Sequence, residues 1–180
     1  MATIQVSEAD IEFLKLIRGN INRFMKQSAA LYANGPARLL DIAPQVHEGA
    51  RPFFPDEVAI ETLDIDPASG CTYIGDICRC NSGIADNTFD FVVCTEVLEH
   101  TLQPFHAVEE MRRILKPGGK LFLTTPFNFR IHGPLPDCWR FTEHGLRALL
   151  GDYRILGLDA LETEGRPLMP VQYAVVAEKP

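Results

Sequence analysis

The hydrophobic pattern opens with a helical period. Over residues 7–33, apolar side chains recur three or four positions apart, which predicts an amphipathic helix. The stripe consists of Ile11, Leu14, Ile17, Ile21, Phe24 and Met25. Ser7 is placed to cap the first turn, with Asp10 three residues further on. Asn-Gly-Pro at 34–36 ends the helix, because Gly allows a left-handed cap and Pro cannot continue the helix.

From residue 37 onward, short apolar runs alternate with helical segments. Strands are predicted over 37–43, 59–64, 72–75, 89–95, 120–125, 154–161 and 172–177, and helices over 105–115 and 142–150. Lys-Pro-Gly-Gly at 116–119 is predicted to stop the first of these helices.

This alternation predicts a mostly parallel sheet that is covered on both faces. Residues 162–170 are too few for a crossover helix, so the last strand is predicted to run antiparallel. The expected fold is therefore an α/β Rossmann-like three-layer sandwich with seven strands. Residues 1–36 would form an N-terminal helical cap and residues 37–180 one domain.

Composition narrows the classes of protein. The 180 residues suffice for one domain, and a net charge of −7 disfavours binding to nucleic acid. The first ten residues lack a basic region leading into an apolar run, and no stretch approaches the ~18 apolar residues of a membrane span. The five cysteines are odd in number and lack zinc-type spacing, so we expect free thiols and a cytoplasmic location.

An acidic residue ends or follows each of four consecutive predicted strands: Asp41, Asp64, Asp76 and Glu96. In an open parallel sheet, ligands bind at the carboxyl ends of the strands. Asp64 is placed to accept the hydroxyls of a ribose, Ile65 to pack on a base, and Asp76 to accept from an adenine amino group. Such a row favours a cationic ligand such as a sulfonium and disfavours the pyrophosphate of NAD, whose GxGxxG motif the sequence lacks. The alternative is that these acids cap the helices that follow.

Three segments resemble the class I S-adenosylmethionine-dependent methyltransferases of type 11. They are DNTFDFVVC at 86–94, EVLEH at 96–100 and RILKPGGKL at 113–121, and the likeness extends from about residue 37 to the C-terminus. PF at 126–127, HGP at 132–134, Asp137 and WRFT at 139–142 are similar to a subgroup associated with glycan and lipopolysaccharide biosynthesis.

The resemblance implies S-adenosylmethionine as cofactor, S-adenosylhomocysteine as product, and a small-molecule acceptor such as a sugar or glycan precursor. It implies that residues 41–44 lie under the methionine part of the cofactor and that residues 64, 65, 76 and 77 hold the nucleoside. Residues 94 and 95 would border the transferring methyl group. The implied cofactor-binding residues are Asp41, Ile42, Ala43, Pro44, Asp64, Ile65, Asp76, Ile77, Cys94 and Thr95.

One turn departs from the family pattern Asp-x-Gly-x-Gly. Residues 41–45 read Asp-Ile-Ala-Pro-Gln, and the first glycine after the strand is Gly49. Glycines at such a turn permit unusual backbone angles and a close approach to a ligand. A non-catalytic, methyltransferase-like binding protein therefore stays open as an alternative, and a nicotinamide oxidoreductase is the third class.

Methyl transfer from a sulfonium requires alignment of the acceptor, and a general base only if the acceptor loses a proton. His132, in the predicted loop at 127–137, is the first candidate for that base, followed by Asp137 and His100. Trp139 and Arg140 are candidates for a wall that stacks on the acceptor or binds its anionic group.

The segment at 96–100 also raises the question of a metal. If it opens a helix, Glu96, Glu99 and His100 share a face and would ligate a divalent ion together with a distant histidine. Metal-free relatives carry the same VLEH sequence, so we expect no metal, with a divalent ion as the alternative. The N-terminal helix covers the cofactor or serves as a dimer arm, which leaves a homodimer open.

Overall fold

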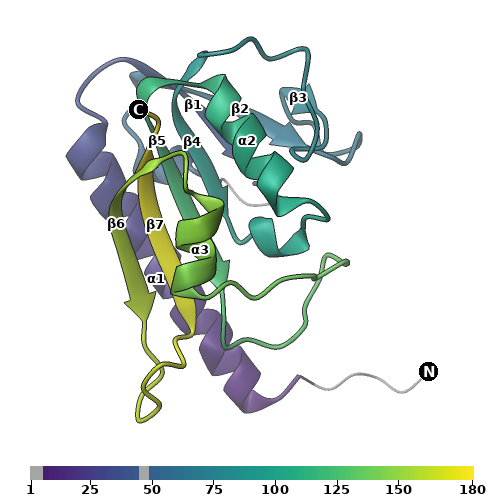
Figure 1. The fold of residues 1–180 in the computed structure, drawn as a ribbon, viewed down its shortest axis with the longest axis vertical. Coiled ribbons are helices and arrows are strands. Elements are labelled where there is room, and N and C mark those ends of the chain that lie inside the picture. Colours follow the sequence, from purple (N-terminus) through teal and green to yellow (C-terminus); the bar gives the residue numbers. More distant parts are fainter. Residues whose placement is uncertain (1–5, 45–48) are drawn as a thin grey trace.

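Seven strands form one sheet in a computed structural model, which describes residues 6–44 and 49–180 (Figure 1). The order across the sheet is β3-β2-β1-β4-β5-β7-β6. The strands are β1 (Ala37–Ile42), β2 (Val58–Asp64), β3 (Tyr73–Ile74), β4 (Phe89–Thr95), β5 (Leu115–Pro126), β6 (Arg154–Leu161) and β7 (Gln172–Glu178). The pairs from β3 to β5 are parallel, and β7 pairs antiparallel with both β5 and β6, so among the described strands it alone runs in the opposite direction. The predicted mixed Rossmann-like sheet is thus confirmed.

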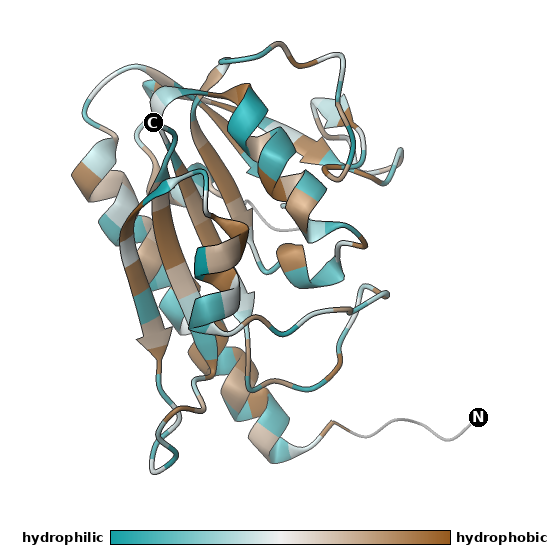
Figure 2. Cartoon of the chain, viewed as in Figure 1, coloured by the Kyte–Doolittle hydropathy of each residue, from teal (hydrophilic) through white to brown (hydrophobic). Residues whose placement is uncertain are grey.

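Helices cover both faces of this sheet. They are α1 (Glu8–Tyr32), α2 (Pro104–Ile114) and α3 (Glu143–Leu149), with short 3-10 helices η1 (Arg51–Phe53) and η2 (Leu98–His100). α1 lies behind the sheet in Figure 1, and α2 and α3 lie in front of it. The strands at the centre of the sheet are largely apolar along their length, whereas the helices show polar residues on their outer sides (Figure 2). The three-layer arrangement follows from these amphipathic faces.

The N-terminal helix begins as its sequence predicts. Ser7 Oγ accepts a 3.1 Å hydrogen bond from the backbone N–H of Asp10 and donates one of 2.7 Å to the Asp10 carboxylate. Further along α1, Phe24 and Met25 are buried against the sheet, where the rings of Phe24 and Phe122 form a T-shaped pair. The C-terminal half of the helix therefore belongs to the core, whereas its N-terminal end, around Ile11, stays partly exposed.

Successive side chains of β5 point to opposite faces of the sheet and pack into two separate hydrophobic cores. Leu121 and Leu123 are buried with α2 and α3, whereas Phe122 between them is buried with α1. Cys94 of β4 lies in the same core as Leu123 and is only 1% exposed.

Two local predictions are wrong. Residues 116–119, expected to be only a helix stop, belong to β5, which begins directly after α2 and pairs irregularly with β4 there. Residues 96–100 do not open an α-helix: Glu96 has a left-handed φ of 54°, and the 3-10 helix η2 follows. The positive φ turns the chain sharply at the strand end. None of the described helices is long and apolar enough to cross a membrane.

Candidate active site

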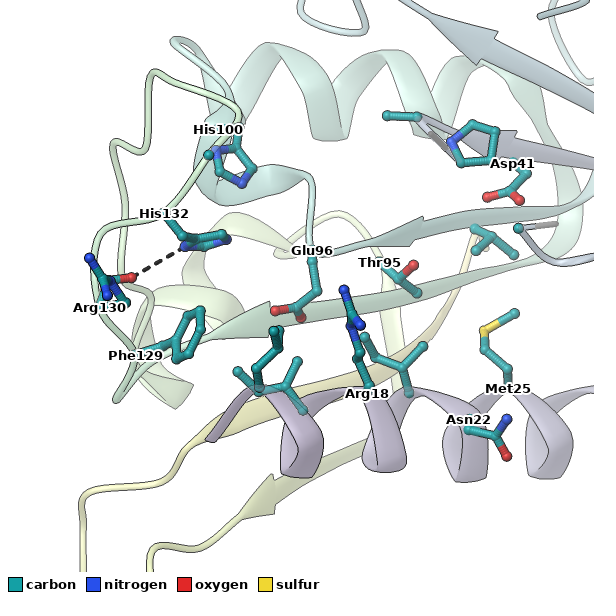
Figure 3. A pocket seen from close by; sticks show the side chains of 18 of the residues that line it. Arg18, Asn22, Met25, Asp41, Thr95, Glu96, His100, Phe129, Arg130 and His132 are labelled. Carbon is teal, nitrogen blue, oxygen red and sulfur yellow. Dashed lines mark hydrogen bonds between the residues drawn. The ribbon is translucent and has the colours of Figure 1, made fainter. Parts of the chain in front are cut away.

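A cavity of about 1020 Å³ lies between α1, the carboxyl ends of β1 and β4, and the segment after β5. Figure 3 shows side chains from α1 pointing up into this space, with Thr95 and Glu96 across from them. Its size is that of a pocket for one large ligand or two small ones. The sheet and loop residues around it include Asp41, Ala43, Pro44, Gly49, Ala50, Thr95, Glu96, His100, Phe129, Arg130 and His132.

The apolar stripe of α1 forms one wall of the cavity. Ile11, Leu14, Ile17, Ile21 and Met25 line it. Arg18 and Asn22 add polar groups on the same side. Near the start of α1, Asp10 pairs with Arg130 of the segment after β5 at 3.2 Å. The predicted stripe therefore faces a cavity along much of its length, and an ion pair links the helix to the opposite wall.

Asp41 is the centre of a tight turn at the end of β1. It is 3% exposed, and its Oδ2 accepts a 2.7 Å hydrogen bond from the backbone N–H of Ala50. Gly49 has a φ of 56°, and a Cβ built on it would overlap Asp41 Oδ2 and crowd Pro44. Burial raises the pKa of Asp41 to about 6, against the lowering effect of the Ala50 hydrogen bond. Gly49 thus allows the close approach that glycines of the pattern Asp-x-Gly-x-Gly allow. Gln45, which belongs to the same turn, lies outside the described residues.

Ala43 has a left-handed backbone in the same turn. Its φ is 51°, at the position where the family pattern has its first glycine. The chain therefore keeps the backbone conformation that glycine would favour while carrying a methyl group into the cavity wall.

Glu96 is fixed by a chain of buried polar groups. Its Oε1 accepts hydrogen bonds from Thr124 Oγ1 at 2.9 Å and from Gln172 Nε2 at 2.7 Å. The side-chain oxygen Oε1 of Gln172 in turn accepts a hydrogen bond of 2.7 Å from Asn20 Nδ2 of α1. Desolvation raises the pKa of Glu96 to about 7, against the lowering effect of these hydrogen bonds. Burial therefore favours the protonated form of this carboxyl group, which lines the cavity.

The segment after β5 is anchored to η2 by four contacts. The backbone N–H groups of Cys138 and Trp139 donate to the carbonyl of Glu99 at 2.7 and 3.2 Å, and Trp139 Nε1 donates to Thr101 O at 2.8 Å. His100 Nδ1 lies 3.0 Å from Pro136 O. Because a carbonyl only accepts, Nδ1 carries a proton, and in the neutral imidazole the lone pair is then on Nε2. Trp139 is thus a structural contact of the loop, and its ring stacks near Phe141.

Asp137 holds His132 and Arg140 together. Its Oδ2 accepts from the backbone N–H of His132 at 2.9 Å, lies 3.1 Å from His132 Nδ1, and accepts from Arg140 Nη2 at 2.8 Å. The hydrogen bonds from Arg140 and His132 overcome the effect of burial and lower the pKa of Asp137 to about 2. Burial lowers the pKa of His132 below its ordinary value, although the Asp137 charge opposes this. Burial therefore favours the neutral form of the His132 imidazole.

Glu99 is buried beside both histidines. Its exposed fraction is 0%, and neither carboxylate oxygen has a hydrogen-bond donor within the part of the chain that the structure describes. Glu99 Oε1 lies 3.7 Å from Nε2 of His100 and 3.7 Å from Nε2 of His132. Burial, with the nearby charge of Glu96, raises the pKa of Glu99 well above its ordinary value.

The structure brings together some of the predicted site residues and separates others. Asp41, Ala43, Pro44, Thr95, His100 and His132 line the cavity. Ile42, Asp64, Ile65, Asp76, Ile77, Cys94 and Asp137 do not.

The nucleoside candidates lie further along the same rim. Asp64 and Asp76 are close in space, because β2 pairs with β3 and the N–H of Gly75 donates to Asp64 O. Ile65 is 68% exposed, so its side chain is free to cover a planar ring. Ile77 is 7% exposed and Cys94 is in the core.

Sequence reasoning missed several cavity residues, among them Arg18, Asn22, Gly49 and Arg130. Gly49 carried a signal, as the first glycine after the strand. Arg18 and Arg130 carried none, because a basic residue on a helix or loop is usually solvated.

A family model described as "Methyltransferase domain" matches residues 25–123, more than half of the chain. The demethylmenaquinone methyltransferase of Paenarthrobacter aurescens is 27% identical over 124 residues, which cover 62% of this chain and 46% of that protein. The ubiquinone biosynthesis O-methyltransferase of Xanthomonas oryzae pv. oryzae is 53% identical over 38 residues, which cover 21% of this chain and 16% of that protein. The chain thus spans less than half the length of either relative.

A solved structure of an S-adenosylmethionine-dependent methyltransferase from Methanosarcina mazei has a TM-score of 0.64. It is 18% identical, with 83% of this chain and 95% of that chain covered. At this identity the likeness establishes the fold, which agrees with the observed sheet order. Taken with the family match over residues 25–123, it follows that the chain belongs to the methyltransferase domain family.

Proposed function

We propose that the protein transfers a methyl group from S-adenosylmethionine to a small-molecule acceptor. The observation that carries the proposal is the cavity at the carboxyl ends of β1 and β4, next to the Asp41 turn, in a chain of the methyltransferase family. A ligand site at this edge is what an open α/β sheet provides.

The residues around the cavity fit such a cofactor. Its volume of about 1020 Å³ accommodates the methionine part of such a cofactor together with an acceptor. The carboxylates of Asp41 and Glu96 favour a cationic sulfonium and ammonium, and Arg18 is available for a carboxylate. When bound, S-adenosylmethionine supplies an electrophilic methyl group.

Within this proposal, residues 41–44 and Thr95 border the methionine part of the cofactor. The ribose hydroxyls bind Asp64, and the adenine lies near Ile65, Asp76 and Ile77. Cys94 contributes through its backbone, because its side chain packs in the core. The nucleoside would extend from the cavity along the rim toward β2 and β3.

His132 is the best placed of the three candidate bases. Burial favours its neutral form, and it lines the cavity. Its Nδ1 lies against Arg130 O and the Asp137 carboxylate. Its Nε2 is therefore the proton-accepting atom. Asp137 is a poor base because its pKa is about 2 and Arg140 binds it. His100 has the same free Nε2 and is the second choice.

The acceptor is a molecule with a substantial apolar part. Exposed apolar side chains surround the opening: Val6, Ile11, Leu14, Ile131 and Leu135. An apolar ring or chain would cover these side chains, whereas a bare sugar would not bury them as favourably. A sugar or glycan precursor, predicted from the subgroup likeness, and a quinone-type ring, named for the curated relatives, are the two acceptors to compare.

Calorimetry with S-adenosylmethionine, S-adenosylhomocysteine and NAD tests the proposal on the full chain. Binding of both sulfur ligands and not of NAD is the expected result. Binding of none of the three would favour the non-catalytic alternative, and binding of NAD alone would favour an oxidoreductase. An alkylated catechol and a nucleotide-free hexose, each offered with labelled S-adenosylmethionine, then compare the two acceptor classes.

A further inference from the structure

Three potential metal ligands converge on one point at the cavity wall. One atom each from Glu99, His100 and His132 lies within 4.8 Å of the others. η2 supplies the first two residues, and the segment after β5 supplies the third. In Figure 3 the rings of His100 and His132 lie close together beside the cavity. Their centroids are 4.8 Å apart.

The tautomers of both histidines direct lone pairs toward Glu99. His100 Nδ1 donates to Pro136 O, and His132 Nδ1 faces Arg130 O and the Asp137 carboxylate. Each Nε2 therefore presents a lone pair, and each lies 3.7 Å from Glu99 Oε1. Histidines that bind metals use this arrangement, in which the second ring nitrogen donates to a carbonyl or carboxylate.

Glu99 lacks the partners that a buried carboxylate requires. It is fully buried, and both of its oxygens are without a hydrogen-bond donor among residues 6–44 and 49–180. A buried carboxylate facing two lone pairs is unfavourable unless a cation or proton lies between them. A tetrahedral ion with ligands at about 2.0–2.2 Å places them roughly 3.3–3.6 Å apart, close to the 3.7 Å between Glu99 Oε1 and each histidine Nε2.

We propose that Glu99, His100 and His132 bind a divalent transition-metal ion, with Zn²⁺ as the ion of first choice. Two imidazoles and one carboxylate suit Zn²⁺, whereas Mg²⁺ and Ca²⁺ prefer oxygen ligands. Three protein ligands leave a coordination position open, as in catalytic zinc sites. Because His100 and His132 line the cavity, that position faces the space where a ligand oxygen would bind.

Glu96 does not belong to this cluster. Its carboxylate is already bonded to Thr124 and Gln172, and the left-handed turn at Glu96 replaces the helix that would have aligned it with Glu99. A lone pair bound to a metal cannot accept a proton, so His132 acts as a general base only in the metal-free protein.

Zinc binding by the full chain tests the site without reference to methyl transfer. Chelator-treated protein is titrated with Zn²⁺ against a chromogenic chelator, and melting is followed with and without Zn²⁺ and with Mg²⁺. We expect one Zn²⁺ per chain, a higher Tm with Zn²⁺, and no such effect of Mg²⁺. Co²⁺ in place of Zn²⁺ should give visible absorption without thiolate charge transfer, because no cysteine belongs to the cluster.

Glu99→Gln and His132→Ala should each weaken Zn²⁺ binding by at least about 100-fold, because the loss of even an outer partner costs about 10–100-fold. His106→Ala and Glu109→Gln on the exposed side of α2 are matched controls and should bind as the wild type does. Circular dichroism verifies that each variant is folded. Wild-type affinity in both site variants, or a cobalt spectrum with thiolate character, would overturn the proposal. These readouts stay informative even if the protein does not bind S-adenosylmethionine.

Discussion

Gly49 packs directly against the carboxylate of Asp41, so closely that no side chain fits at position 49. A Cβ at position 49 would overlap Asp41 Oδ2, and the φ of 56° is one that L side chains rarely adopt. The same turn delivers the N–H of Ala50 to that oxygen. A single glycine thus allows the end of β1 to bury an acid beside the cavity.

Gly49→Ala should therefore destabilise the fold. Left-handed strain and the clash with Asp41 together cost about 1–3 kcal/mol. Urea denaturation measures the loss. Gly83→Ala is the control, because a Cβ there meets nothing within 4 Å and the φ is ordinary. Equal stabilities of the two variants would mean that the turn is not tight.

Asp41 should make stability depend on pH. Burial raises its pKa to about 6, whereas an unfolded aspartate titrates near ~3.9. The folded state holds the proton more tightly, so this stabilising contribution is full below about pH 4 and is lost as the pH rises through about 6.

Asp41→Asn removes that titration. The free energy of unfolding of the variant, relative to wild type, should rise by about 3 kcal/mol between pH 4 and pH 7.5. Denaturation curves at a series of pH values, without ligand, measure the difference. Asp159→Asn on exposed β6 is the control variant. A flat difference for Asp41→Asn would show that this carboxyl group is not desolvated.

The sequence predicted the elements because their patterns are local. The stripe of α1, the cap at Ser7 and the apolar run of β4 each needed only neighbouring residues. The acidic strand ends were found for the same reason. The site was harder, because its geometry depends on backbone angles at Ala43 and Glu96 that no pattern records.

The cluster at Glu99 illustrates this limit. Sequence spacing suggested that Glu96 and His100 would share a helical face with Glu99. The left-handed turn instead directed Glu96 to Thr124 and Gln172, while His132 was brought to Glu99 by contacts 30 or more residues apart in sequence. Only the folded loop decides which histidine is the distant partner.

Asp64→Ala should weaken binding of S-adenosylmethionine. Loss of charge-assisted hydrogen bonds to the ribose costs about 1–3 kcal/mol, or about 5- to 150-fold in Kd. Calorimetry measures the change, with Asp159→Ala as the control, because this exposed carboxylate lies on β6, at the opposite edge of the sheet from β2 and β3. An affinity equal to that of the control would place the ribose elsewhere.

Gln172→Leu should loosen the attachment of α1 to the sheet. Gln172 is 0% exposed and joins Asn20 of α1 to Glu96, so its loss leaves two buried polar groups without this partner. The expected cost is about 1–3 kcal/mol of unfolding free energy. Gln27→Leu on the exposed side of α1 should change stability little. Chemical denaturation compares the two, and similar losses would mean that the buried bridge adds no stability.

Arg140 should stabilise the segment after β5 against local opening more than it stabilises the sheet. Its guanidinium binds both oxygens of Asp137, whose side chain is 0% exposed, and also donates to Arg130 O at 2.9 Å. Arg140→Ala leaves that carboxylate buried without its cation, at a cost of about 2–3 kcal/mol, since Arg140 itself is partly exposed.

Because Asp137 also fixes the backbone of His132, the segment should open locally before the sheet unfolds. Hydrogen exchange at residues 129–138 should therefore accelerate much more than exchange in β4 and β5. Arg140→Lys keeps the charge but not the two-pronged geometry, so its exchange rates should fall between those of wild type and Arg140→Ala. Uniform acceleration across loop and strands would show that the ion pair supports the whole domain rather than the cavity wall.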